Sequence, residues 1–165
     1  MRRSSPMGSH PKPGGPDQSF TGPEPLVVYL VEDEFDIRLT LKRVLESVQI
    51  TCHAYESAED FLEGYEPGSN DCLVLDMRLP GRSGLELQRM VRDRGYSPPI
   101  IFISAHGDAS AVARAMKNGA HDFITKPFSY DLLIDVIRQA VHAGRQQRQA
   151  AEVRKRLGQR LTRLS

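Results

Sequence analysis

From Leu26 to about residue 143, short apolar runs alternate with segments of helical hydrophobic spacing. The apolar runs hold four to six residues with little polar alternation, as buried strands do. They predict five strands, at 26–31, 50–55, 72–76, 99–104 and 122–125. The intervening segments predict five helices, at about 37–48, 57–64, 84–95, 109–118 and 129–143.

Local signals support these helices. Ser57 opens a Ser-Ala-Glu-Asp capping motif, and Asn118-Gly119 is a typical helix stop. We expect the third helix to face inward with Leu87, Met90 and Val91. We expect the fifth to turn Leu132, Leu133, Val136, Ile137, Ala140 and Val141 toward the sheet.

Strands that alternate with helices predict an α/β fold with right-handed crossovers and a parallel sheet covered on both faces. In such sheets, ligand chemistry lies beyond the carboxyl ends of the strands, where the strand order reverses. The polar residues at those ends are therefore the candidates for function.

Two further segments flank this predicted domain, 26–143. Residues 1–25 contain six prolines and four glycines, a composition typical of disorder. Residues 144–165 predict a basic amphipathic linker helix that extends past the fifth helix. Its apolar seam is interrupted by Gly158, which argues against a stable coiled coil. A solvated linker is the favoured interpretation of its basic face, with direct contact to nucleic-acid phosphates as the alternative.

The formal net charge of +1 conceals a segregation of charge. Residues 145–165 carry seven basic side chains and one acidic one, whereas residues 26–144 sum to −6. Cys52 and Cys72 are too few for a disulfide framework, so we expect both to be reduced. No apolar run approaches the roughly 20 residues of a membrane helix, and no signal peptide opens the chain. These features predict a cytoplasmic protein.

Four of the five strand ends carry chemically useful groups. Glu32 and Asp33 follow the first strand, and Asp76 ends the third. Ser104 ends the fourth strand, and Lys126 follows the fifth. Taken singly, such residues are more often turn residues, helix caps or solvated charges. Together they predict a site.

Three carboxylates in one crevice repel each other by roughly 4 kcal/mol per close pair. Either some of them stay protonated or a cation lies among them, and hard oxygen ligands suit Mg²⁺. An ammonium and a hydroxyl beside such an ion suit an incoming phosphoryl group. Asp76 is the predicted nucleophile because it ends the central third strand, and Asp33 and Glu32 are the predicted metal ligands.

Four segments carry a resemblance to a known family: LVEDE (30–34), LVLDMRLPGRSGLEL (73–87), FISAHGD (102–108) and GAHDFITKPF (119–128). They resemble the receiver domain of bacterial two-component response regulators, in the LuxR-type, FixJ-like class. The resemblance covers about residues 26–143. It implies a flavodoxin-like, CheY-like doubly wound (βα)5 fold with strand order 2-1-3-4-5.

The resemblance also implies roles for individual residues. Asp76 matches the phosphoacceptor, served by the phosphohistidine of a sensor histidine kinase. The Mg²⁺ ligands would be Asp33, Glu32 through water, Asp76 and the backbone carbonyl of Arg78. Further matches are Ser104 and Phe123 as switch residues, Lys126 as the family's lysine, Pro127 after a cis peptide bond, and Arg78 and His106 as the positions that tune phosphoryl lifetime.

Two positions depart from the commonest family pattern. The acidic pair is Glu-Asp rather than Asp-Asp, a variant that the family tolerates. The hydroxyl is Ser104 rather than threonine, and it lacks the methyl group that would bias its rotamer. We therefore expect the two switch states to be less sharply separated.

The resemblance implies that phosphorylation changes the face formed by the fourth helix, fifth strand and fifth helix, and that it promotes a homodimer. The favoured output is transcription through a helix-turn-helix DNA-binding domain that is not in this sequence. The alternative is a stand-alone receiver that shuttles phosphoryl groups or binds a protein partner. An aspartyl phosphatase is disfavoured because position 78, two residues after the nucleophile, is arginine rather than an acid. A scaffold unable to accept phosphate is disfavoured by the intact acidic cluster with Ser104 and Lys126.

Overall fold

The computed structural model describes residues 25–105 and 107–163, in which strands and helices alternate strictly. The strands are β1 (Val27–Val31), β2 (Thr51–Tyr55), β3 (Asp71–Asp76), β4 (Ile100–Ser104) and β5 (Asp122–Thr125). The helices are α1 (Phe35–Ser47), α2 (Ala58–Gly64), α3 (Gly84–Asp93), α4 (Ala109–Lys117) and α5 (Tyr130–Arg163). The predicted α/β architecture is confirmed, with differences of a few residues at the element ends except at the C-terminal end of α5.

The five strands form one parallel sheet in the order β2-β1-β3-β4-β5, as predicted. β3 occupies the centre, with β1 on one side and β4 on the other. The order reverses between β1 and β3, so the carboxyl ends of these two strands flank the switch point of the sheet. This is the edge at which a parallel α/β fold places its chemistry.

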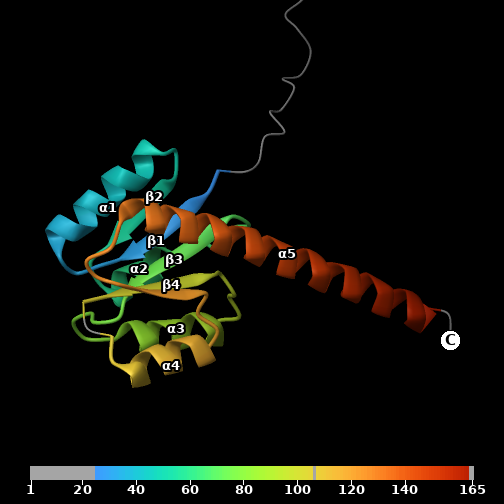
Figure 1. Cartoon of the computed structure of the whole chain (residues 1–165). Coiled ribbons are helices and arrows are strands. Elements are labelled where there is room, and N and C mark those ends of the chain that lie inside the picture. The colour runs from blue at the N-terminus through green and yellow to red at the C-terminus, as the bar shows by residue number, and fades with distance from the viewer. Residues whose placement is uncertain (1–24, 106, 164–165) are drawn as a thin grey trace, which may run out of the picture.

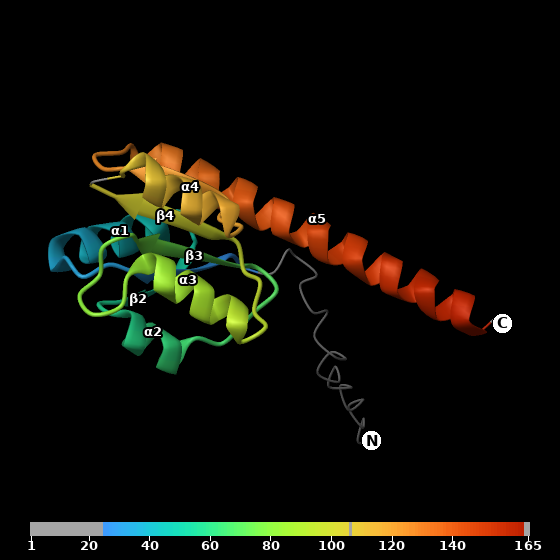
Figure 2. The same ribbon diagram turned by 90° about the horizontal axis from the view of Figure 1, so that it is seen from below.

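Each face of the sheet has its own apolar core, because successive residues of a strand point to opposite faces. Val28 and Leu30 of β1 pack with α1 and α5, whereas Tyr29 and Val31 pack with α2, α3 and α4. Both faces are therefore buried, which explains why the strands contain almost no polar residues. The layers are seen in Figure 1, and Figure 2 shows them from below.

Side-chain caps fix where several helices begin. The hydroxyl of Ser57 accepts a hydrogen bond from the backbone N–H of Asp60, which confirms the predicted start of α2. Ser83 and Asp108 cap α3 and α4 in the same way. α4 ends at Lys117 with Asn118 as its C-cap, followed by Gly119 with φ of 96°, a left-handed conformation that suits glycine.

One inward-facing prediction is wrong, and a second holds only in part. Leu132 is 49% exposed, whereas Ile134, which was not predicted, is 7% exposed. At about 100° per residue, Leu132 falls outside the buried stripe of α5 that is centred near Ile137. In α3, Met90 is only partly buried, whereas Gln88, which was not predicted, is buried and donates its amide N–H to the carbonyl of Ala115 in α4.

The fifth helix is much longer than the domain requires. It runs without a break from Tyr130 to Arg163, so residues 144–163 continue α5 rather than forming a separate helix. Figure 1 shows α5 crossing the sheet and projecting well beyond it. Arg148 donates to the backbone carbonyls of Gly68 and Ser69, in the loop before β3. From residue 149 to 162 every side chain is exposed.

Other parts of the chain complete this description. The predicted disordered segment, 1–25, lies outside the described residues except for Pro25. Within 25–105 and 107–163, no helix has the length and apolar character needed to cross a membrane. Cys52 and Cys72 are both buried, and neither forms a disulfide among the described residues.

Candidate functional site

The predicted site residues come together at one edge of the sheet. Glu32 and Asp33 directly follow β1, Asp76 ends β3, Ser104 ends β4, and Lys126 follows β5. The parallel register brings these ends to the same level; Asp76 pairs with Ile103, and Ser104 with Thr125. Residues separated by up to 94 positions in sequence are thereby placed in contact.

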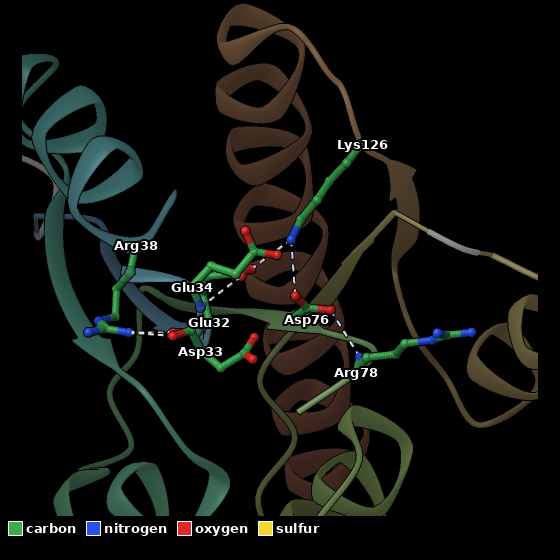
Figure 3. Close-up of polar contacts among 7 residues, drawn as sticks. All are labelled: Glu32, Asp33, Glu34, Arg38, Asp76, Arg78 and Lys126. Carbon is green, nitrogen blue, oxygen red and sulfur yellow. Dashed lines mark hydrogen bonds and ion pairs between the residues drawn. The ribbon is translucent and has the colours of Figure 1, made fainter. Parts of the chain in front are cut away.

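Lys126 is the centre of the polar contacts. Its Nζ donates to Oε2 of Glu32 at 3.0 Å and to Oδ2 of Asp76 at 3.0 Å. Glu32 is fully buried, Asp76 is 5% exposed, and the Lys126 side chain is 13% exposed. Figure 3 shows the ammonium lying between the two carboxylates. Such a bridge offsets part of the cost of burying two like charges together.

Backbone groups satisfy the remaining oxygens of these two acids. Oε1 of Glu32 accepts from the N–H of Glu34 at 3.3 Å, and Oδ1 of Asp76 accepts from the N–H of Arg78 at 2.9 Å. The Arg78 side chain is exposed and extends away from the carboxylates in Figure 3. The loop after β3 therefore contributes its backbone to the site at Arg78.

Burial and mutual repulsion still shift the pKa values of the cluster, although Lys126 neutralises part of its negative charge. Burial, hydrogen bonding with Asp76 and the charge of Asp76 together raise the pKa of Glu32 to about 7, although Lys126 acts to lower it. Burial by itself would lower the pKa of Lys126, but its hydrogen bonds to Asp76 and Glu32 and their negative charges raise it overall. The cluster holds three acids and one ammonium, so it remains electronegative.

A metal ion fits this donor set. Each of Glu32, Asp33 and Asp76 offers a carboxylate oxygen, and these oxygens lie within 4.8 Å of one another. Asp33 is exposed, and no cation pairs with it anywhere in the part of the chain that the structure describes. Clustered hard oxygens with one side open to water are the ligands that Mg²⁺ prefers.

The other predicted residues occupy the surroundings of the cluster. Ser104 is 1% exposed at the end of β4. Phe123, in β5, is partly buried and stacks on Phe102, with the ring centroids 6.4 Å apart. The peptide bond between Lys126 and Pro127 is cis. His106 lies outside the described residues.

Sequence reasoning missed two residues that shape the site. Glu34 supplies the backbone N–H that contacts Glu32. Arg38, in the first turns of α1, donates from Nη1 to the carbonyls of Glu32 at 2.9 Å and Asp33 at 3.2 Å. The arginine therefore holds the backbone that carries both acids. Its spacing in the sequence gave no signal, because the contact depends on how the chain turns between β1 and α1.

Comparison with known families decides what this arrangement is. Residues 28–138 match the model of the response regulator receiver domain. The chain belongs to the receiver-domain family of response regulators. The predicted resemblance is thus confirmed, and the acidic Glu32, Asp33 and Asp76 cluster is typical of a receiver Mg²⁺ site. As predicted, a receiver is a signalling domain rather than an enzyme.

The relatives of this receiver include transcriptional regulators of the FixJ type. It is 40% identical to the transcriptional regulatory protein TdiR of Thauera aromatica over 119 residues, covering 72% of this chain and 52% of TdiR. It is 35% identical to the transcriptional regulatory protein FixJ of Azorhizobium caulinodans over 143 residues, covering 87% of this chain and 68% of FixJ. This chain spans about half the length of several curated relatives.

Solved structures agree with the fold. The response regulator StyR is similar with a TM-score of 0.74 and 39% identity, covering 86% of this chain and 71% of StyR. The N-terminal part of FixJ, FixJ-N, is similar with a TM-score of 0.64 and 35% identity, covering 72% of this chain and 95% of FixJ-N. Both support the CheY-like order of strands seen here.

Proposed function

We propose that Asp76 of this receiver accepts a phosphoryl group from the phosphohistidine of a sensor histidine kinase. The observation that carries the proposal is the cluster in which Lys126 bridges Asp76 and Glu32 at 3.0 Å while Asp33 stays open to solvent. A carboxylate oxygen of Asp76 forms a bond to phosphorus as the P–N bond of the donor breaks. The electron pair of that bond leaves with the imidazole.

We assign the Mg²⁺ ligands to Asp33, Asp76 and the backbone carbonyl of Arg78, with Glu32 acting through water. A bound Mg²⁺ would neutralise charge on the phosphoryl oxygens. The residues of the chain do the rest. In this proposal Lys126 stabilises the negative charge as it moves from the Asp76 carboxylate to the phosphoryl oxygens, and the Ser104 hydroxyl binds one of those oxygens.

A protein donor is supported by the surface around the site. Phe35 and Tyr130 are 63% and 44% exposed, and an apolar hollow lies beside Lys126. Ile37 of α1 and Phe128 of the β5–α5 loop help to line the hollow. Exposed aromatic side chains next to a reactive group favour docking of another protein rather than of a small donor alone.

The proposed consequence is a change of the α4–β5–α5 face. Ser104 moves toward the phosphoryl group, Phe123 changes its ring position, and a homodimer forms through this face. The proposed output is transcription in the bacterial cytoplasm through a helix-turn-helix domain of the whole protein. Regulators such as TdiR and FixJ, which match this chain over about half to two thirds of their length, support that output. A stand-alone receiver that signals through a protein partner is the alternative.

Intact-mass measurement after incubation with acetyl phosphate and Mg²⁺ tests the chemistry. We expect one phosphoryl adduct on the wild-type protein and none on Asp76→Asn or in the presence of a chelator. Dimer formation is then measured by sedimentation with and without the adduct. A wild-type protein that takes up no phosphoryl group under these conditions would remove Asp76 as phosphoacceptor.

A further inference from the structure

Gly107, in the connection between β4 and α4, lies directly against the ring of Phe123. A Cβ atom at this position would stand 2.8 Å from Cε1 and 3.0 Å from Cζ of that ring. It would also stand 3.5 Å from Cγ2 of Val112 in α4, an ordinary contact distance. The ring of Phe123 thus occupies space that a side chain at residue 107 would need.

The backbone conformation at position 107 does not require a glycine. The described glycines with positive φ are Gly81, Gly95 and Gly119, and Gly107 is not among them. An alanine at 107 would therefore suffer no strain from a left-handed conformation. What glycine supplies here is room for the Phe123 ring.

The ring rather than the backbone would yield to a larger residue. Cε1 and Cζ lie at the far end of a side chain with two rotatable bonds, and Phe123 is only partly buried. Gly84 shows the opposite case, because a Cβ there would stand 2.4 Å from the backbone oxygen of Asp76. A substitution at 107 thus changes the ring position while leaving the sheet in place.

We infer that Gly107 is a positioning residue for Phe123: its missing side chain sets which ring positions are open and so how strongly phosphorylation is coupled to the output face. Ser104 lies three residues before Gly107, so the connection that leads from the phosphoryl site also touches the ring. The coupling half of this inference rests on the proposed function of Phe123. The steric half does not.

The steric half is tested without any phosphoryl donor. Wild type, Gly107→Ala and Gly68→Ala are compared by NMR with labelled phenylalanine. Gly68 is the matched control because a Cβ there would meet nothing within 4 Å. We expect the Phe123 ring signals to shift in Gly107→Ala and to match wild type in Gly68→Ala. Unchanged Phe123 signals in Gly107→Ala overturn the inference.

The coupling half compares dimer dissociation constants with and without phosphorylation. In Gly107→Ala the ring is excluded from its present position in both states. We therefore expect the phosphorylation-dependent change in affinity to shrink by about fivefold or more. If the Phe123 ring moves in Gly107→Ala but phosphorylation changes dimer affinity as much as in wild type, the inference is overturned.

A double variant covers the case in which Gly107→Ala folds poorly. Phe123→Ala removes the ring atoms with which an alanine at 107 would clash, so the combined variant has room for both changes. We expect it to respond to phosphorylation as Phe123→Ala does alone. A further loss of the response caused by Gly107→Ala in the Phe123→Ala background shows that Gly107 acts other than through the ring and overturns the inference.

The failure of the proposed function has a separate outcome. A wild-type protein that is not phosphorylated, or does not dimerise, refutes the proposed function. The NMR comparison then still decides whether Gly107 positions the ring.

Discussion

Lys126 is the residue on which the charge balance of the site depends. It contacts the buried acids of two strands, and its own side chain is 13% exposed. Burial of Glu32 and its proximity to Asp76 raise the pKa of Glu32 to about 7, so the cluster has a strong affinity for positive charge. The negative charge of the cluster favours binding of a cation. Without a bound cation, the same charge would repel an anionic phosphoryl donor.

Arg78 is the residue whose side chain we expect to govern phosphoryl lifetime. Its backbone N–H contacts Asp76, while its side chain is exposed and free to lie over a phosphoryl group. We predict that phosphorylated Arg78→Ala loses the phosphoryl group about threefold faster, which corresponds to a barrier lower by about 0.7 kcal/mol. Stopped-flow decay measures this.

Arg82→Ala is the control for Arg78→Ala. Arg82 belongs to the same loop, but it pairs with Glu59 at 3.2 Å and so points elsewhere. It should decay at the wild-type rate. Equal lifetimes for Arg78→Ala and wild type would remove the shielding role.

The two cysteines give a prediction with a defined pH dependence. Burial raises the pKa of Cys52 to about 12 and that of Cys72 as well. At pH 8 the folded Cys52 thiol is then ionised in about one molecule in ten thousand, against about one in ten when unfolded. We expect both thiols to react very slowly with a disulfide reagent until urea unfolds the chain. Rapid native labelling of two thiols would contradict their burial.

The raised pKa values of the cysteines also make the free energy of unfolding depend on pH. A pKa that is raised in the folded state favours folding below the unfolded value, near 9, and this contribution is lost as the pH rises toward the folded value. The cysteines should therefore lower the free energy of unfolding above about pH 9. Replacing Cys52 with alanine should flatten that part of the stability profile.

Among the elements, α3 depends on a single glycine for its position. Gly84 begins the helix, and a Cβ there would stand 2.4 Å from the Asp76 carbonyl oxygen and 3.1 Å from Cα of Met77. Because these are backbone atoms of Asp76 and Met77, no side-chain rotation relieves the clash. α3 must instead move away from β3.

We predict that Gly84→Ala lowers the free energy of unfolding by about 2–3 kcal/mol. It should also slow phosphorylation by acetyl phosphate, because the Asp76 backbone moves with the clash. Urea unfolding and intact mass measure the two effects, with Gly68→Ala as the control that has open space. A variant as stable as wild type would show that the α3–β3 contact adapts more easily than its geometry indicates.

At the scale of the whole molecule, an acidic body and a basic extension share one continuous helix. Residues 26–144 sum to −6, whereas 145–165 carry seven basic side chains and one acidic one. Arg148 holds the extension against the loop before β3, and beyond it the described side chains are exposed through residue 162. The part of α5 after Arg148 thus contributes little to the stability of the domain.

We predict that removing residues 149–165 leaves the receiver intact. The melting temperature should stay within about 2 °C of the full chain, because no buried apolar side chain is lost. The phosphoryl yield should be unchanged. The net charge should fall from +1 to −3, since five basic residues and one acidic residue are removed. Calorimetry and intact mass test this, and a large loss of stability would mean that the extension packs against the body.

The elements, the strand-end chemistry and the family can be inferred from the amino-acid sequence alone. Apolar runs of strand length and helical spacing depend only on neighbouring residues, and parallel sheets place strand ends together. Glu32, Asp33, Asp76, Ser104 and Lys126 could therefore be named before any contact was known.

Which of these residues are in contact, and what surrounds them, depends on how the whole chain packs. The Lys126 bridge to Glu32 joins residues 94 positions apart, and its length depends on the packing of the whole sheet. The roles of Arg38, Gln88 and Gly107 follow from how loops and helices meet across that sheet, as does the exposure of Leu132. Such contacts depend on the paths of separate segments through space, and no local pattern of residues records them.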